Sequence, residues 1–192
     1  LGSAAHLIGV VGNDEAAEEL HSRLSAAGVY CDFIHSDDKP TVTKLRVISQ
    51  HQQLIRLDFE QLLEPPDVEG LLKQASILIN DSDVMLLSDY GKGALQDVQQ
   101  LIKLGRSKKI PIIVDPKGTD FKKYKGATLM TPNLSEFEAF VGKSENEEDF
   151  VDKGLKLLSD LALEALLITR GEHGMTLLRP DSPELHLPAR AQ

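Results

Sequence analysis

The sequence predicts an α/β protein with a mostly parallel central sheet and a small antiparallel β flap. After Pro65 and Pro66, short apolar stretches alternate with segments whose apolar residues recur at helical spacing. Parallel strands need crossover connections, and helices between the strands supply them. Residues 29–59 differ, because they hold three short stretches rich in β-branched and aromatic residues, separated by Asp-Asp-Lys-Pro and His-Gln.

The elements follow one another in a clear order. A buried strand at residues 5–11 leads into a helix that Asn13 or Asp14 caps and Gly28 ends. The flap takes strands at residues 29–35, 42–49 and 53–59. Further helices are predicted at residues 67–79, 94–104, 134–141 and 147–161, and further strands at residues 84–88, 110–114, 127–130, 165–169, 175–179 and 184–187.

Composition narrows the class of protein. With 41% hydrophobic and 27% charged residues, a chain of 192 residues is typical of one globular domain. The net charge of −9 argues against nucleic acid as a partner, and the apolar runs are far shorter than a membrane span. Cys31 is the single cysteine, which excludes a disulfide framework. Since no signal peptide is apparent, we expect a cytoplasmic protein that contacts no membrane.

Polar, turn-forming residues follow four successive predicted strands. In open α/β sheets ligands bind outside the carboxyl ends of the strands, so this edge is a candidate site. The same residue types also form ordinary turns, and that alternative stays open at this point. The four segments are Ser88-Asp89, Asp115-Pro116-Lys117-Gly118, Thr131-Pro132-Asn133 and Thr169-Arg170-Gly171.

The segment from Asn133 to Glu136 has two interpretations. Asn133 stands where a helix N-cap is expected and Glu136 follows three residues later, which is the spacing of a capping box. Alternatively, both side chains hold water around a Mg²⁺ ion, which binds few protein ligands directly and keeps most of its hydration shell.

The sequence contains none of the common glycine-rich loops that bind phosphate, so any phosphate site in this chain uses another arrangement. Gly91-Lys92-Gly93 matches neither a P-loop nor a dinucleotide fingerprint, and the six histidines lack metal-binding spacing. Lys44 and Arg46 lie two residues apart in a predicted strand and therefore share a face. Such a pair suits the phosphate of a sugar phosphate, although a solvated strand face would look the same.

Four segments stand out as a set: Thr41-Val42-Thr43-Lys44-Leu45-Arg46-Val47-Ile48, Ser88-Asp89-Tyr90-Gly91-Lys92-Gly93, Val114-Asp115-Pro116-Lys117-Gly118 and Thr131-Pro132-Asn133-Leu134-Ser135-Glu136-Phe137-Glu138. Together they resemble the ribokinase-like (PfkB) carbohydrate kinases, in particular the heptose 7-phosphate kinase domain of ADP-heptose synthases. The similarity extends over essentially the whole chain. Asn-x-x-Glu is shared across the family, whereas the run from Gln52 to Asp58 points to the heptose branch.

The resemblance implies a ribokinase-like three-layer sandwich with ATP and Mg²⁺ as cofactors. The implied reaction transfers the γ-phosphoryl group of ATP to C1 of D-glycero-β-D-manno-heptose 7-phosphate. The 1,7-bisphosphate product serves ADP-heptose and lipopolysaccharide core biosynthesis. A homodimer formed through the flap, which would also cover the sugar site, is implied as well, and a fused nucleotidyltransferase domain is compatible with the resemblance.

Individual roles follow from the matching positions. The resemblance implies that Asn133 and Glu136 organise Mg²⁺ through water. It implies sugar-phosphate binding by Lys44, Arg46, Asp89 and Lys92. It implies nucleotide binding by Asp115, Lys117, Asn133, Glu136, Thr169, Arg170, Gly171 and Gly174.

Both ends of the chain depart from the family pattern. The chain opens with Leu1-Gly2, without an initiator Met, and ends at Gln192 directly after a predicted strand, so we expect a domain truncated at both ends. The family's sugar-binding segment, Gly-Gly-x-x-x-Asn, and its Asp-x-x-Gly-Ala-Gly-Asp segment are not in this sequence. The last Asp of the latter is the catalytic base, so no catalytic residue is assigned within 1–192 and the fragment alone is predicted to be inactive.

Two other functions remain open on the sequence. One is a different ribokinase-like kinase, for example one acting on a fructose phosphate, which a panel of substrates would separate. The other is a non-catalytic module that binds a nucleotide or a sugar phosphate. A Gly-Ala-Gly-Asp segment shortly after Gln192 would argue against that module.

Overall fold

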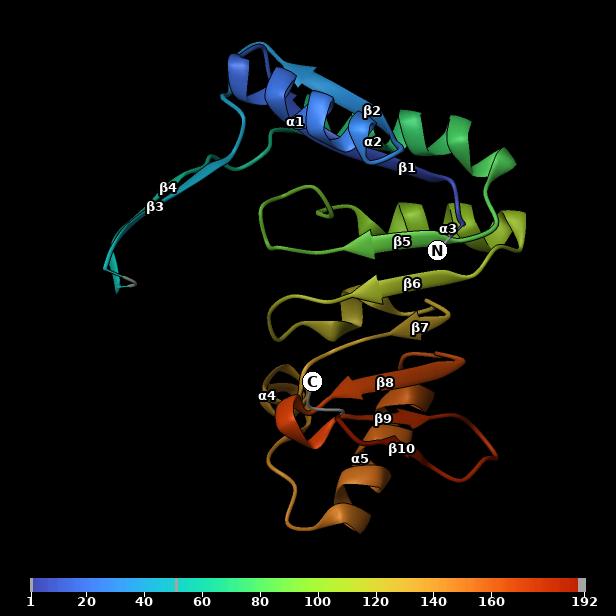
Figure 1. The fold of residues 1–192 in the computed structure, drawn as a ribbon. Coiled ribbons are helices and arrows are strands. Elements are labelled where there is room, and N and C mark those ends of the chain that lie inside the picture. The colour runs from blue at the N-terminus through green and yellow to red at the C-terminus, as the bar shows by residue number, and fades with distance from the viewer. Residues whose placement is uncertain (1, 51, 190–192) are drawn as a thin grey trace. The chain divides into compact units, whose positions relative to one another are not determined.

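The computed structural model describes residues 2–50 and 52–189. They form two compact units (Figure 1). Among the described residues, unit 1 comprises those up to Leu78 together with Lys92–Gln96, and unit 2 comprises Ile79–Gly91 and those from Asp97 onward. Strands and helices alternate along most of the chain, which confirms the α/β class predicted from the sequence.

Unit 1 is built on a parallel pair of strands joined by a helix. Its elements are β1 (Ala5–Gly12), α1 (Glu15–Ala26), β2 (Val29–Ser36), β3 (Thr43–Ser49), β4 (Gln52–Phe59) and α2 (Pro65–Leu78). Asp14 caps α1, because its carboxylate accepts a hydrogen bond of 2.9 Å from the Ala17 N–H. Gly70 lets α2 approach β2 closely, since a Cβ atom there would lie 2.9 Å from Ile34 Cγ2.

The flap is smaller than the sequence predicted. β2 pairs with β1 in parallel, with Val29 opposite Ala5, so residues 29–36 belong to that sheet. The flap itself is the antiparallel ribbon of β3 and β4, with Leu45 opposite Leu57. The prediction was wrong because β-branched and aromatic residues indicate a strand but not its partner. The crossover through α1 is the connection that parallel pairing requires.

Within the described residues, unit 2 holds a six-stranded sheet. Its strands are β5 (Met85–Ser88), β6 (Ile112–Asp115), β7 (Leu129–Met130), β8 (Ala165–Thr169), β9 (Met175–Leu178) and β10 (Leu185–Leu187), in the order β10-β9-β8-β7-β6-β5. Neighbours from β5 to β8 pair in parallel, whereas β9 and β10 pair antiparallel at one edge. The expectation of a mostly parallel sheet is therefore confirmed. The helices are α3 (Val98–Lys108), α4 (Leu134–Val141) and α5 (Glu147–Asp160), with 3₁₀ helices at Ile79–Asp81, Phe121–Tyr124 and Gly171–His173.

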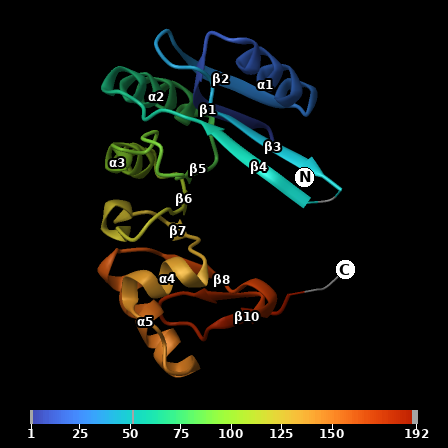
Figure 2. The same ribbon diagram turned by 90° about the vertical axis from the view of Figure 1, so that its left-hand side faces the viewer.

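One face of this sheet carries the core of unit 2. Alternate residues of β6, β8 and β9 are buried, and the fully buried Val114 lies opposite Met130 of β7. Two glycines allow helices to approach this face. A Cβ atom at Gly105 of α3 would lie 2.6 Å from a side-chain atom of β6, and one at Gly154 of α5 would lie 2.2 Å from a side-chain atom of β9. Both helices therefore cover the same side of the sheet (Figure 2).

Helix boundaries differ from the prediction mainly at α3. This helix begins at Val98 instead of residue 94, because the preceding residues form turns in which Gly91 and Gly93 have φ angles of 68° and 98°. Such angles are accessible to glycine at little cost but interrupt a helix. None of the helices in the described part of the chain is long and apolar enough to cross a membrane.

Candidate active site

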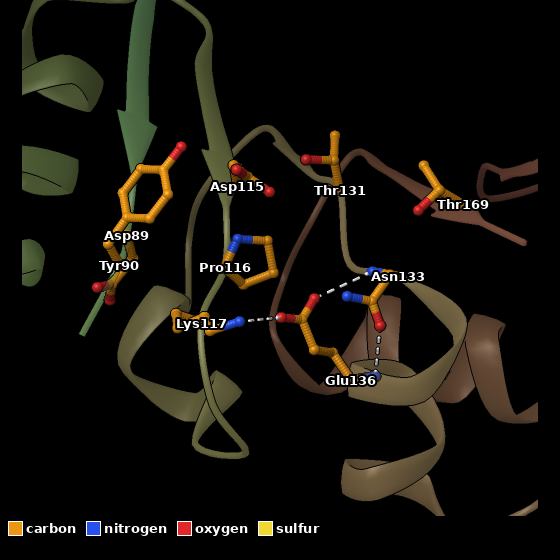
Figure 3. Close-up of a pocket in the computed structure, with 9 residues that line it drawn as sticks. All are labelled: Asp89, Tyr90, Asp115, Pro116, Lys117, Thr131, Asn133, Glu136 and Thr169. Atoms are coloured by element: carbon orange, nitrogen blue, oxygen red, sulfur yellow. Dashed lines mark hydrogen bonds and ion pairs between the residues drawn. The ribbon is translucent and has the colours of Figure 1, made fainter. Parts of the chain in front are cut away.

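The carboxyl ends of four neighbouring parallel strands meet at one edge of unit 2. Because β5, β6, β7 and β8 are adjacent and parallel, residues that follow them come together although they are distant in sequence. They form a pocket of about 350 Å³ (Figure 3). The convergence expected from the polar strand ends is confirmed. The pocket is lined by Asp89, Tyr90, Asp115, Pro116, Lys117, Thr131, Asn133, Glu136 and Thr169.

The helix α4 starts at this pocket with a complete capping box. The Glu136 N–H donates to Asn133 Oδ1 at 2.9 Å, and the Asn133 N–H donates to Glu136 Oε2 at 3.1 Å. The other carboxylate oxygen of Glu136 lies 3.4 Å from Lys117 Nζ (Figure 3). The capping interpretation of these two residues is thus confirmed, and their role at Mg²⁺ stays a prediction.

Asp115 brings a second carboxylate to the pocket, at the end of β6. Partial burial, and then the negative charge of Glu136, raise the pKa of Asp115, and the Lys117 cation offsets only part of this. Two carboxylates that repel each other form a place where a cation is stabilised. The arrangement therefore favours binding of a positively charged group between Asp115 and Glu136.

This donor set fits a hydrated Mg²⁺ ion. Mg²⁺ takes oxygen ligands, keeps several waters and is held through one or two carboxylates together with substrate phosphates. Asp115 and Glu136 supply two carboxylates, and Thr131 and Asn133 add further oxygen atoms to the lining. The part of the chain that the structure describes contains no group of three or more His, Cys, Asp or Glu residues arranged for a metal. These residues therefore do not form a metal site in which the protein alone supplies all the ligands.

Asp89 has most of its hydrogen-bonding capacity already occupied. It is 6% exposed and accepts hydrogen bonds from Lys123 Nζ at 2.6 Å, from the Tyr124 hydroxyl at 2.6 Å and from the Gly91 N–H at 2.7 Å. Burial opposes ionisation of this carboxylate, but the three donors outweigh burial and lower the pKa of Asp89. Asp89 therefore mainly holds neighbouring parts of the chain together, and its contact with the substrate stays a prediction.

The residues around the turn after β8 divide into two groups. Thr169 lines the pocket, whereas Arg170, Gly171 and Gly174 lie outside its lining. Arg170 donates to both carboxylate oxygens of Glu147, at 2.5 and 2.9 Å. Gly171 and Gly174 have φ angles of 58° and 83°, and a Cβ atom at Gly174 would lie 2.0 Å from a carbonyl oxygen of β10. These glycines shape the turn, and nucleotide contact by all three residues stays a prediction.

The other residues implied in substrate binding belong to unit 1. Lys44 and Arg46 lie two apart on the exposed strand β3, so they share a face of the ribbon as predicted. Arg56 lies opposite Arg46 on β4 and adds a third cation to this face. Lys92 forms an ion pair with Glu60, so its ammonium already has a partner. A role for these cations at a sugar phosphate stays a prediction.

Several residues of the site were not singled out from the sequence. Tyr90 and Thr131 line the pocket; Thr131 stands in a polar segment at a strand end and Tyr90 directly follows another, so their position was a usable signal. Lys123 and Tyr124 bind Asp89 from 34 and 35 residues away. No spacing rule connects residues so far apart, and only the fold reveals this contact.

Comparison with known proteins establishes the family. The model of the pfkB family carbohydrate kinases matches residues 1–192. The chain belongs to this family. The Bifunctional protein HldE of Hahella chejuensis is 57% identical to this pfkB-family chain over 192 residues, covering 100% of the chain and 40% of that relative. The resemblance inferred from the sequence is thereby confirmed, and the chain spans 40% of the length of this curated relative.

Solved structures of other proteins share the fold of this chain. Phosphofructokinase-2 from Escherichia coli in complex with potassium superposes with a TM-score of 0.77 at 18% identity, covering 98% of this chain and 62% of that one. Arabidopsis thaliana ribokinase complexed with ribose and ATP gives a TM-score of 0.72 at 17% identity, with coverages of 96% and 61%. The ribokinase-like fold class expected for this pfkB-family chain is therefore confirmed.

Proposed function

We propose that the protein containing this chain transfers the γ-phosphoryl group of ATP to C1 of D-glycero-β-D-manno-heptose 7-phosphate. The observation that carries the proposal is the pocket at the strand ends of unit 2, found in a chain that belongs to a carbohydrate kinase family. The product is the 1,7-bisphosphate used to make ADP-heptose and the lipopolysaccharide core.

Different residues of the pocket bind the nucleotide phosphates and the Mg²⁺ ion. Lys117 provides a positive charge for a phosphate, and Asp115 and Glu136 hold the hydrated Mg²⁺. When bound, this ion neutralises charge on the phosphates during phosphoryl transfer. Thr169 offers a hydroxyl at the end of β8, beside the turn that Gly171 shapes. Phosphoryl transfer depends mainly on positioning and charge stabilisation, and these residues serve both needs.

The heptose assignment rests on the sequence. The run from Gln52 to Asp58 in β4 resembles the heptose branch, and the relative with 57% identity is a Bifunctional protein HldE. That relative is more than twice as long as this chain and bifunctional by name, which supports a second domain in the whole protein. The family resemblance suggests that this second domain is a nucleotidyltransferase. We place the protein in the cytoplasm, because its proposed substrate ATP is available there and because the single, free cysteine Cys31 suits a reducing compartment.

The test is an assay of the full-length protein with ATP, Mg²⁺ and heptose 7-phosphate. Fructose 6-phosphate and ribose serve as comparison acceptors. We expect kcat/KM for the heptose phosphate to exceed the other two by at least about 100-fold, because a site that hydrogen-bonds specific hydroxyl groups rejects analogues that misplace them. Faster turnover of fructose 6-phosphate would overturn the heptose assignment, and no ATP consumption with any sugar would overturn the kinase assignment.

We further propose that the β3–β4 ribbon forms a homodimer contact. One of its faces carries Leu45, Val47, Ile55 and Leu57, which are 48%, 41%, 47% and 38% exposed in the isolated chain. A two-stranded ribbon is marginally stable unless it packs on something, and a second ribbon offers a matching apolar face.

Light scattering should therefore give a dimer for the full-length protein. Leu45→Asp should shift it toward monomer, because a carboxylate in the contact must be desolvated. Leu62→Asp, at a residue 67% exposed outside the ribbon, is the control and should remain dimeric. A wild-type monomer at concentrations well above those of the assay, or a dimeric Leu45→Asp variant, would contradict the proposal.

A further inference from the structure

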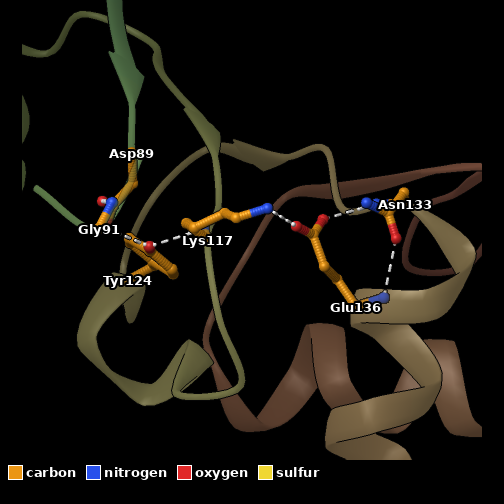
Figure 4. A network of polar contacts seen from close by, with 6 residues as sticks. All are labelled: Asp89, Gly91, Lys117, Tyr124, Asn133 and Glu136. Carbon is orange, nitrogen blue, oxygen red and sulfur yellow. Dashed lines mark hydrogen bonds and ion pairs between the residues drawn. The ribbon is translucent and has the colours of Figure 1, made fainter. Parts of the chain in front are cut away.

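A buried hydroxyl group connects the ends of two strands at the pocket. Tyr124 lies in the short helix Phe121–Tyr124 and is fully buried. Its hydroxyl donates to Asp89 Oδ2 at 2.6 Å and accepts a hydrogen bond of 3.2 Å from the Lys117 N–H (Figure 4). Asp89 follows β5 and Lys117 follows β6, so one phenol group ties together two of the turns that form the pocket.

Asp89 is a well-fixed hydrogen-bond acceptor for the Tyr124 hydroxyl. Its carboxylate is also held by Lys123 Nζ at 2.6 Å and by the Gly91 N–H at 2.7 Å. The Lys123 ammonium lies 4.9 Å from the centre of the Tyr124 ring, which adds a cation–π contact. Burial, and then the Asp89 carboxylate, raise the pKa of Tyr124 to about 12. The hydroxyl therefore keeps its proton at neutral pH and remains a donor to Asp89.

The side chain of Lys117 extends the same network into the pocket. Its ammonium lies 3.4 Å from Glu136 Oε1, and Glu136 Oε2 accepts the Asn133 N–H (Figure 4). The Lys117 side chain is 57% exposed, and a long exposed side chain explores many rotamers. The positions open to the Lys117 ammonium therefore depend on how well the Lys117 backbone is fixed. The Tyr124 hydroxyl fixes this backbone by accepting the Lys117 N–H.

We propose that Tyr124 is a positioning residue for nucleotide binding, which fixes the Lys117 backbone against Asp89 and so places the Lys117 ammonium beside Glu136. A phenylalanine would fill the same space in the core, so the hydroxyl is explained by its two partners. The proposal rests on the proposed function for the identity of the ligand, a nucleotide phosphate. The contacts among Asp89, Tyr124 and Lys117 do not depend on it.

The test compares Tyr124→Phe with wild type in the full-length protein. We expect the affinity for the ATP analogue AMP-PNP with Mg²⁺, measured by titration calorimetry, to fall about tenfold, because the partly buried Lys117 N–H loses its acceptor and the Lys117 charge is less well placed. The KM for ATP should rise similarly, and the KM for heptose 7-phosphate should not change. Tyr30→Phe removes a phenol hydroxyl from an exposed residue of unit 1 and should leave the AMP-PNP affinity and both KM values unchanged.

A double-mutant cycle separates positioning from a purely structural role. Lys117→Ala removes the ammonium group from the pocket, so the AMP-PNP affinity lost in this variant is the part that depends on Lys117. If Tyr124 acts through Lys117, Tyr124→Phe will weaken AMP-PNP binding much less in the Lys117→Ala background than in wild type. An equal loss in both backgrounds, or an unchanged affinity for a folded Tyr124→Phe variant, would overturn the proposal. A wild type inactive on heptose 7-phosphate would overturn the proposed function, while the AMP-PNP affinities would still decide the role of Tyr124.

Asp89→Asn provides a second route if Tyr124→Phe does not fold. Asparagine keeps an acceptor for the Gly91 N–H but loses the charge that orients the Tyr124 hydroxyl. A folded Asp89→Asn variant should show the same weakening of AMP-PNP binding, and wild-type affinity would overturn the proposal. If neither variant folds, the network serves stability alone and the proposal fails.

Discussion

Glu136→Gln is expected to reduce kcat/KM of the full-length kinase by about 10²–10³-fold, with a raised Mg²⁺ requirement and normal folding. Glutamine keeps an oxygen that can accept the Asn133 N–H, so the capping box at the start of α4 survives. What disappears is the charge that faces Lys117 and Asp115 and attracts the hydrated cation. The measurement is a titration of Mg²⁺ at saturating ATP and sugar phosphate, beside a thermal unfolding curve.

Asp149→Asn is a matched control for Glu136→Gln. Asp149 also stands at the third position of a helix, α5, accepts a backbone N–H from Glu145 and pairs with a lysine, Lys153. Asp149→Asn also removes one carboxylate charge from a helix start, but this residue does not line the pocket. We expect wild-type activity and Mg²⁺ dependence from this control. Wild-type metal dependence in Glu136→Gln would leave that residue with its capping role only.

Arg46→Ala is expected to raise the KM for heptose 7-phosphate by about 10- to 100-fold and to leave the KM for ATP nearly unchanged. A phosphate dianion needs fixed cationic donors, and Arg46 shares a ribbon face with Lys44, opposite another cation, Arg56. Hydrogen bonds to a charged group lose more free energy on deletion than neutral ones, which sets the size of the effect. Steady-state kinetics with each substrate varied in turn give both constants.

Arg23→Ala is the control for the loss of an exposed arginine. Arg23 lies on α1, where its side chain is 78% exposed and pairs with Glu19. Removing it should change neither KM, because exposed ion pairs of this kind contribute little. If Arg46→Ala also left the KM for the sugar phosphate unchanged, the ribbon cations would be a solvated face and the phosphate would bind elsewhere.

The starts of α4 and α5 were predicted correctly from the sequence. Asn133 and Asn146 both cap helices in the structure, and the α4 helix predicted at residues 134–141 has the bounds observed. N-cap residues act on backbone groups within three or four positions, so sequence alone carries the information. Where glycines with positive φ precede a helix, as Gly91 and Gly93 do before α3, the start was misplaced because the apolar pattern extended into the turn.

Strand partners were less predictable than strands. Residues 29–36 were expected in the flap and instead pair in parallel with β1, because a strand's composition reflects a pleated, half-buried surface and not its neighbour. The candidate site was largely predictable, since any set of adjacent parallel strands gathers its carboxyl ends at one edge. Asp115, Lys117, Asn133, Glu136 and Thr169 meet there as that rule requires.

The sequence by itself determined the α/β class, the order of elements, the cap of α4 and the family resemblance, because each depends on local patterns or on the chain's own motifs. Only the tertiary structure decided which polar side chains remain available to a ligand. It placed Lys123 and Tyr124 on Asp89, turned Arg170 toward Glu147 and paired Lys92 with Glu60. The physical reason is that hydrogen bonds and ion pairs form between groups that the fold brings within about 3 Å, whatever their separation in sequence.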